Sequence, residues 1–174
     1  MLARRTTRWV VCLGFALVLA LASGPSAIAW AWPLDGAVLR GFSVSSDTYA
    51  AGQHRGIDIA LGDSSAIRAP VSGEVTFAGW VPTNGLTVTI ATGDYKTSLT
   101  HLGALRVRRG VSVVEGDLVA DPGPSGEAEY DLPYIHLGIR VGASESYVDP
   151  LELLPARSVS VSYTHLTLPT ILLV

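Results

Sequence analysis

Cysteine is nearly absent from this sequence. The single cysteine, Cys12, lies inside an apolar stretch near the N-terminus. A folded part without cysteine cannot be stabilised by disulfide bonds, even in a compartment that permits them. Because Cys12 lies within the apolar stretch and not at its end, it is also poorly placed for a lipid-modified N-terminus. The 174 residues are enough for one domain stabilised by its own apolar core.

Long apolar runs are scarce as well. The run from Val10 to Ala22 is shorter than the ~20 residues of a membrane-spanning helix. It follows three arginines and precedes Ala27-Ile28-Ala29, an A-x-A cleavage pattern. We therefore predict a signal peptide over residues 1–29, with an uncleaved anchor as the alternative. The mature protein is then secreted or in the cell envelope, with no membrane contact after cleavage.

Charge is low, and basic residues are the scarcer kind. Charged residues make up 16% of the chain, and the hydrophobic content of 48% excludes disorder. Removing the predicted signal leaves nine basic against fifteen acidic residues, a net charge of −6. An acidic domain is a poor candidate for nucleic-acid binding, so we expect no such partner.

The folded domain is expected over residues 30–157, as a monomer. The tail 158–174 is doubtful, because it resembles translated sequencing-adaptor DNA more than domain sequence. A genuine edge strand is the alternative there.

The sequence is rich in short runs of Val, Ile, Thr and Tyr, separated by Gly and Pro. No segment keeps a helical period over three turns. The pairs Asn84-Gly85 and Gly93-Asp94 predict hairpins. This pattern predicts a mainly β fold, either an antiparallel β-sandwich or a small barrel. The expected strands are Val38–Val44, Gly56–Leu61, Gly73–Val81, Leu86–Thr92, Tyr95–Leu102 and Ile135–Val141.

Two segments fall outside this pattern. Asp149 and Pro150 predict a capped helical turn. The segment Ala120–Asp131, acidic and rich in Gly and Pro, is interpreted as a mobile loop beside a site, with a plain surface loop as the alternative.

The candidate chemistry lies in the histidines. His54 and Asp58 are four residues apart, which on a straight strand is ~13 Å, too far for one metal ion to bridge. A sharp bend at Gly56, with positive φ, would bring them together. Without such a bend, the two residues have no reason to form a site.

Two further histidines lie on predicted strands. His136 points to the same face as Tyr134, and His101 is in phase with Leu99. For each of the two, the alternative is a buried histidine that hydrogen-bonds to backbone carbonyls.

The motifs H-x-x-x-D, T-H-L and x-x-H-L-G, in this order, resemble the lysostaphin-like (LytM-type) zinc endopeptidases of bacterial cell walls. The resemblance extends from about Trp32 to Pro155 and includes "HRGIDIA", "APVSGEV", "TVTIATGDYKTSLTHL" and "YVDPLELLP". It implies that His54, Asp58 and His136 bind Zn²⁺ and that His101 is catalytic. It further implies that the protein hydrolyses amide bonds in peptidoglycan, its expected partner.

This ligand set is chemically consistent with catalysis. Two imidazoles and one carboxylate leave a fourth position open, as in catalytic zinc sites. A zinc ion there polarises a carbonyl and lowers the pKa of water to ~7. His101 would transfer a proton or stabilise the tetrahedral intermediate.

One residue departs from the family pattern. The usual motif is H-x-H, and here its first position is Tyr134. A phenol with a pKa near ~10 cannot accept a proton at pH 7, although it can donate a hydrogen bond to an oxyanion. Two interpretations follow: a zinc metalloendopeptidase that uses Tyr134, or a weakened or inactive homologue that binds the wall or regulates other hydrolases.

Two weaker signals point elsewhere. "APVSGEV" also resembles carrier domains that attach biotin or lipoate to a lysine, but the only lysine, Lys96, lacks the flanking residues of such carriers. Arg106, Arg108 and Arg109 form a basic cluster, either a solvated turn or a contact for an anionic wall polymer.

Overall fold

The computed structural model describes residues 28–45, 47, 51–142, 144 and 146–157. The predicted signal peptide and the doubtful C-terminal tail therefore lie outside the described residues, apart from residues 28 and 29. Within the described residues, no helix has the length and apolar content needed to cross a bilayer.

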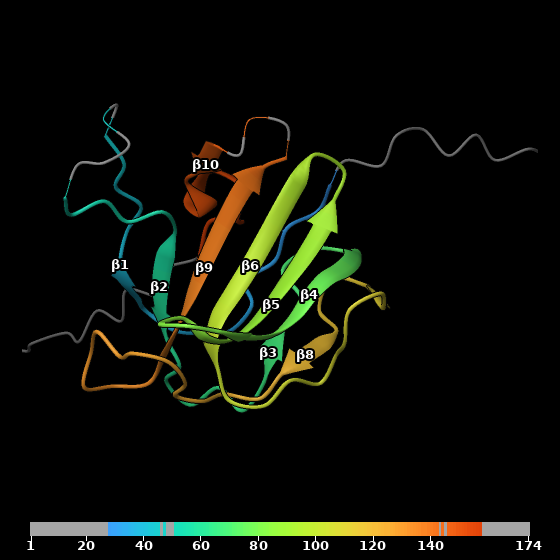
Figure 1. The fold of residues 1–174 in the computed structure, drawn as a ribbon, viewed down its shortest axis with the longest axis horizontal. Helices are drawn as coiled ribbons and strands as arrows, with labels where there is room; N and C mark the ends of the chain where they lie inside the picture. Colours follow the sequence, from blue (N-terminus) through green and yellow to red (C-terminus); the bar gives the residue numbers. More distant parts are fainter. Residues whose placement is uncertain (1–27, 46, 48–50, 143, 145, 158–174) are drawn as a thin grey trace, which may run out of the picture.

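The fold is mainly β, with antiparallel strands in one large and one small sheet (Figure 1). The large sheet has the order β1-β2-β9-β6-β5-β4-β7, and β10 also pairs with β9. Its strands are β1 (Val38–Arg40), β2 (Ile57–Ala60), β4 (Gly73–Val81), β5 (Gly85–Thr92), β6 (Tyr95–Leu102), β7 (Ser112–Val113), β9 (Tyr134–Val141) and β10 (Ser146–Val148). The small sheet pairs β3 (Ile67–Arg68) with β8 (Leu118–Ala120).

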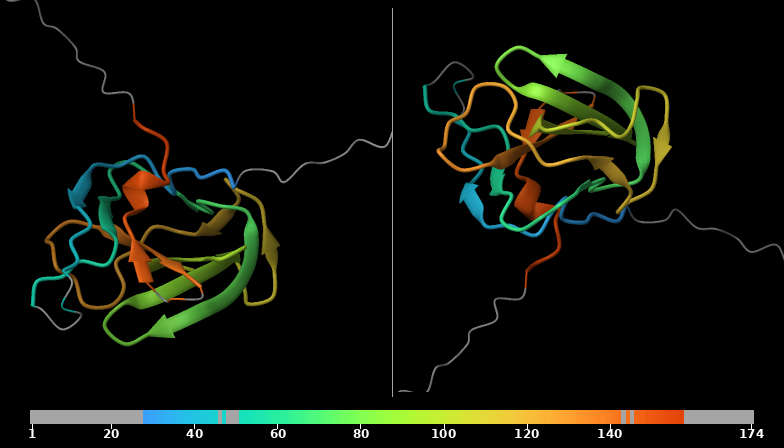
Figure 2. Two further views of the ribbon diagram at one scale, coloured as in Figure 1. Left: turned by 90° about the horizontal axis from the view of Figure 1, so that it is seen from above. Right: turned by 90° about the horizontal axis from the view of Figure 1, so that it is seen from below.

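The large sheet is curved, and β4 bends round one side of the molecule (Figure 2). The β4–β5 register shifts between Val75 and Phe77, and irregularities of this kind increase twist and bending. The path of the sheet ends at β1 and β7, and these two strands are not paired with each other in the described residues. The prediction of a mainly β, antiparallel fold is confirmed, and the strands of the described residues do not close into a barrel.

The core lies between the large sheet and the β3–β8 pair. Strand β9 shows why: Ile135, Leu137 and Ile139 are fully buried, while Tyr134, His136 and Arg140 point to the other face. Ile67 of β3 and Val119 of β8 are fully buried in the same apolar cluster. The outer face of the central strands is therefore left for polar side chains.

Most predicted strands match the structure. Gly73–Val81 and Tyr95–Leu102 are correct to the residue, and the expected hairpins are formed, with positive φ at Gly85 and Gly93. The first strand was predicted too long: β1 ends at Arg40, and Ser43 forms only an isolated bridge with His54. The short strands β3, β7, β8 and β10 were missed because two or three residues are too few to show a period.

The predicted helical turn is also present. It is a 3₁₀ helix, η1 (Pro150–Glu152), with proline at its start. The carboxylate of Asp149 accepts a hydrogen bond of 2.9 Å from the backbone N–H of Leu151, as expected of a capping residue.

Candidate metal centre

The imidazole of His54 is fixed before β2 begins. His54 is bridged to Ser43 by two backbone hydrogen bonds of 2.6 and 2.9 Å. Its Nδ1 lies 2.8 Å from the carbonyl oxygen of Gly41. A carbonyl only accepts, so Nδ1 carries the proton and the lone pair of Nε2 is available on the opposite side of the ring. This is the tautomer that a metal ligand requires.

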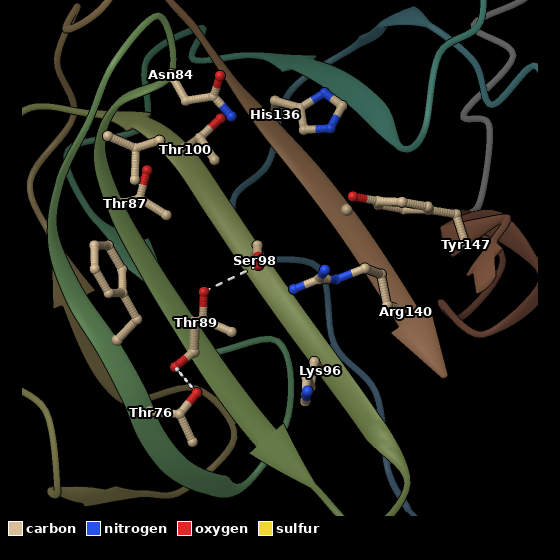
Figure 3. Close-up of a pocket in the computed structure, with 13 residues that line it drawn as sticks. Thr76, Asn84, Thr87, Thr89, Lys96, Ser98, Thr100, His136, Arg140 and Tyr147 are labelled. Carbon is tan, nitrogen blue, oxygen red and sulfur yellow. Dashed lines mark hydrogen bonds between the residues drawn. The ribbon is translucent and has the colours of Figure 1, made fainter. Parts of the chain in front are cut away.

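Asp58 lies between the two histidines. Its Oδ2 is 3.1 Å from Nε2 of His54, and its Oδ1 is 2.8 Å from Nδ1 of His136. The residue is only 2% exposed. It faces His136 directly across the β2–β9 pair, so the sheet register sets the contact. Figure 3 shows His136 on the outer face of β9.

The electrostatics keep this carboxylate ionised. Burial raises the pKa of Asp58, but the hydrogen bond from His136 and the electrostatic interactions with His136 and His54 outweigh it. With a further hydrogen bond from Tyr130, they hold the pKa of Asp58 below its ordinary value. The buried group is thus a carboxylate anion at neutral pH, ready to ligate a cation.

Gly56 allows this arrangement, although not in the predicted manner. The backbone does bend at Arg55 and Gly56, between the bridge at His54 and the start of β2. However, Gly56 does not have the positive φ that the sequence analysis assigned to it. Its role is steric: a Cβ there would lie 2.3 Å from the carbonyl oxygen of Leu137 and 2.6 Å from Nε2 of His136. Only glycine lets β9 and its histidine come this close.

Tyr130 is a member of the site that the sequence analysis missed. Its hydroxyl donates a hydrogen bond of 2.9 Å to Oδ2 of Asp58. Burial and this hydrogen bond raise the pKa of Tyr130 to about 12. The residue lies in the predicted loop Ala120–Asp131, whose lack of period gave no signal of where its side chains point. That loop therefore does reach the site.

His101 reaches the site through a β-bulge at the end of β6. Strict alternation along β6 would keep His101 in phase with Leu99, but the structure breaks this phase. Between Leu99 and Leu102, the β5–β6 register shifts, and His101 has φ 61°, a conformation uncommon for residues other than glycine. The bulge moves Leu102 into the core and His101 to the site.

His101 and Tyr134 face each other. Nδ1 of His101 lies 2.9 Å from the carbonyl oxygen of Ser125, so Nε2 carries the lone pair and lies 3.5 Å from the Tyr134 hydroxyl. The hydroxyl oxygen also accepts a hydrogen bond of 3.2 Å from the backbone N–H of Glu129. Burial raises the pKa of Tyr134, which keeps the phenol neutral. The pair thus presents one proton acceptor and one O–H donor.

The ligand atoms of His54, Asp58 and His136 all lie within 4.8 Å of one another. These residues fit a zinc ion, because two imidazoles and one buried carboxylate converge and leave a coordination position open. The fourth histidine, His165, lies outside the described residues.

A groove of about 500 Å³ runs from this cluster over the outer face of the sheet (Figure 3). His136 lies at one end of it. Most of the residues that line it have polar side chains, among them Thr87, Thr89, Ser98 and Thr100. By contrast, Arg106 of the predicted basic cluster lies outside this groove and is paired with Asp121, its Nε 2.8 Å from the carboxylate.

Comparison with known proteins identifies the family. Residues 52–150, more than half of the chain, match the model of peptidase family M23. The murein hydrolase activator NlpD of Salmonella dublin is 33% identical over 131 residues, which are 74% of this chain and 32% of that protein. The chain thus spans about a third of the length of the curated relatives it matches.

Two solved structures illustrate the likeness in fold. A putative M23 peptidase from Pseudomonas aeruginosa has 28% identity and a TM-score of 0.59, over 72% of this chain and 50% of that one. The catalytic domain of lysostaphin from Staphylococcus simulans has 21% identity and a TM-score of 0.58, over 67% of this chain and 90% of that one. With the family match over residues 52–150, these findings show that the chain belongs to peptidase family M23.

Proposed function

We propose that this protein is a zinc-dependent endopeptidase of the cell envelope that hydrolyses amide bonds in peptidoglycan peptides. His54, Asp58 and His136 bind the metal, and His101 and Tyr134 are the catalytic residues. The observation that carries the proposal is the position of Asp58, whose two carboxylate oxygens lie 3.1 Å from Nε2 of His54 and 2.8 Å from Nδ1 of His136.

The buried carboxylate makes sense as part of a metal site. A carboxylate that is only 2% exposed carries a large desolvation cost, which two imidazoles offset only in part while they are neutral. A divalent cation bound among these donors would offset the remaining desolvation cost of the carboxylate. When bound, zinc acts as a Lewis acid that polarises the scissile carbonyl and acidifies a water molecule.

The protein's own groups supply the remaining functions. Nε2 of His101 accepts a proton from the attacking water and returns it to the leaving amine. The hydroxyl of Tyr134 donates a hydrogen bond to the oxygen on which negative charge develops. Because Glu129 N–H and His101 Nε2 both lie near that hydroxyl, its orientation is fixed before substrate arrives.

A second function is favoured by one comparison. NlpD is named as an activator of murein hydrolases, and the relatives also include outer membrane antigenic lipoprotein B of Haemophilus influenzae. These names support an envelope location. They also support a domain that binds the wall and activates a separate hydrolase, with Tyr134 marking weakened catalysis.

Two measurements separate the functions. The purified chain should contain about one zinc ion, His54→Ala should lose it, and His101→Ala should keep it while losing turbidity clearing of purified cell walls. Without stoichiometric zinc in the unmodified chain, the enzyme proposal is wrong. If zinc is present, no clearing occurs and the chain accelerates a separate wall hydrolase, the activator function holds.

The substitution Tyr134→His tests the departure from the family pattern. It restores the first histidine of the family's H-x-H motif, which can act as a general acid or base. The rate of wall clearing should therefore rise while the zinc content stays unchanged. If the rate does not rise from an already high value, Tyr134 is a fully competent catalytic residue.

A further inference from the structure

The end of the groove away from His136 is cationic. Lys96 of β6 and Arg140 of β9 are directly opposite each other in the sheet register, and both side chains line the groove. Like charges directly opposite on one face of a sheet repel each other.

The described lining of the groove contributes no carboxylate of its own beside Arg140. None of the thirteen residues that line the groove is acidic. In the part of the chain that the structure describes, no ion pair involves Arg140. Its guanidinium instead lies 5.7 Å from the ring centre of Tyr147, which also has Arg55 at 5.5 Å. The aromatic ring holds Arg140 in place without neutralising it.

The opposite end of the groove contains a buried hydroxyl group. Thr100, only 4% exposed, is opposite His136 in the β6–β9 register, and its hydroxyl has no hydrogen-bond partner among the described residues. A buried hydroxyl without a partner costs free energy until a ligand pairs with it. The groove thus has a hydrogen-bonding group beside the metal centre and positive charge at its far end.

The spacing between the two ends matches a peptide. His136 and Arg140 are four residues apart on β9, a distance of ~13 Å along the strand. A peptide bound in extended form advances about 3.3–3.6 Å per residue, so about four residues fill this length. In Figure 3 the Arg140 side chain points towards Ser98 on the neighbouring strand β6.

We propose that Arg140, with Lys96 opposite, forms a carboxylate-binding subsite that selects peptides bearing a negative charge about four residues from the amide at the metal centre. This inference rests on the proposed function, since it assumes that the bound ligand is a peptide lying along the groove. Arginine suits the task because its planar guanidinium binds a carboxylate through two hydrogen bonds.

Binding and cleavage are tested separately. The probes are labelled peptides of glycine and alanine. Each carries one Glu about four residues before or about four residues after a central amide, and each has a matched peptide with Gln in place of Glu. Their affinities for the zinc-loaded full chain with His101→Ala are measured by fluorescence anisotropy. One Glu peptide should bind about 10- to 100-fold more tightly than its Gln partner. The preference should weaken as salt is added.

Variants assign the preference to the subsite. Arg140→Met should abolish the preference for Glu, and Arg140→Lys should keep part of it, which excludes misfolding as the cause. Arg108→Met removes the same charge from an exposed residue outside the groove and should change neither affinity. Equal binding of Glu and Gln peptides at both positions, or an unchanged preference in Arg140→Met, overturns the proposal.

Cleavage of the same peptides by the unmodified chain tests the peptidase function. If the peptides are bound with a preference for Glu but are not cut, the carboxylate subsite is supported and the proposed peptidase function is contradicted. Peptides that are cut without any preference contradict the subsite alone.

Discussion

Tyr130 donates a hydrogen bond of 2.9 Å to Oδ2 of Asp58, the oxygen that faces Nε2 of His54. A loop residue thus orients a carboxylate that belongs to a strand. Hydrogen bonds of this kind typically change metal affinity by 10- to 100-fold when they are removed, because they fix the ligand in its binding orientation.

Tyr130→Phe should therefore weaken zinc binding by about 10- to 100-fold without unfolding the protein. Competition with a chromogenic chelator measures the affinity. Tyr95→Phe is the matched control, because Tyr95 packs against the Trp30 ring far from the metal ligands and should bind zinc as the unmodified chain does. Equal affinities in Tyr130→Phe and the control would show that the hydrogen bond has no role in metal binding.

Gly56→Ala should disrupt the site. The added methyl group would meet the carbonyl of Leu137 at 2.3 Å and Nε2 of His136 at 2.6 Å, and the backbone carbonyl cannot move freely. We expect a loss of about 1–3 kcal/mol in the free energy of unfolding, together with lost zinc. Gly41→Ala, where a methyl group would meet nothing within 4 Å, should leave both unchanged. Denaturant titration and metal analysis report the two effects.

The left-handed backbone of His101 should cost stability. Relative to His101→Ala, His101→Gly should be more stable by about 1–2 kcal/mol, because both variants remove the imidazole and only glycine relieves φ 61°. Both should keep zinc and lose about 10²–10⁴ in cleavage rate. Urea unfolding compares the two variants. Equal stabilities would mean that the bulge holds this conformation without strain.

Tyr134→Phe should slow cleavage by a factor that does not vary with pH. Burial raises the pKa of Tyr134 above its ordinary value of ~10, so the phenol stays protonated throughout pH 6–9. An oxyanion donor is then lost equally at each pH, with an expected decrease of about 10²–10³. The measurement is the ratio of the cleavage rates of the unmodified chain and Tyr134→Phe at several pH values. A ratio that changes between pH 6 and 9 would indicate that Tyr134 titrates during the reaction.

Much of the fold could be predicted from the sequence because strand signals are local. Alternation in "YIHLGIR" placed Tyr134 and His136 on one face and the buried isoleucines on the other, as the structure confirms. The same local reasoning failed at His101, because a bulge reverses the phase of every residue that follows it. It also gave the wrong explanation for Gly56, whose importance lies in a contact with a strand about eighty residues away.

The sequence by itself determined which donor groups exist, where most of the longer strands lie and which faces of those strands are apolar. Only the tertiary structure decided that Asp58 is opposite His136, that Tyr130 reaches Asp58, and that Lys96 is opposite Arg140. The reason is physical. Strand formation and burial follow from the residues' own periodicity, whereas register, bulges and loop paths are set by packing between segments far apart in the chain.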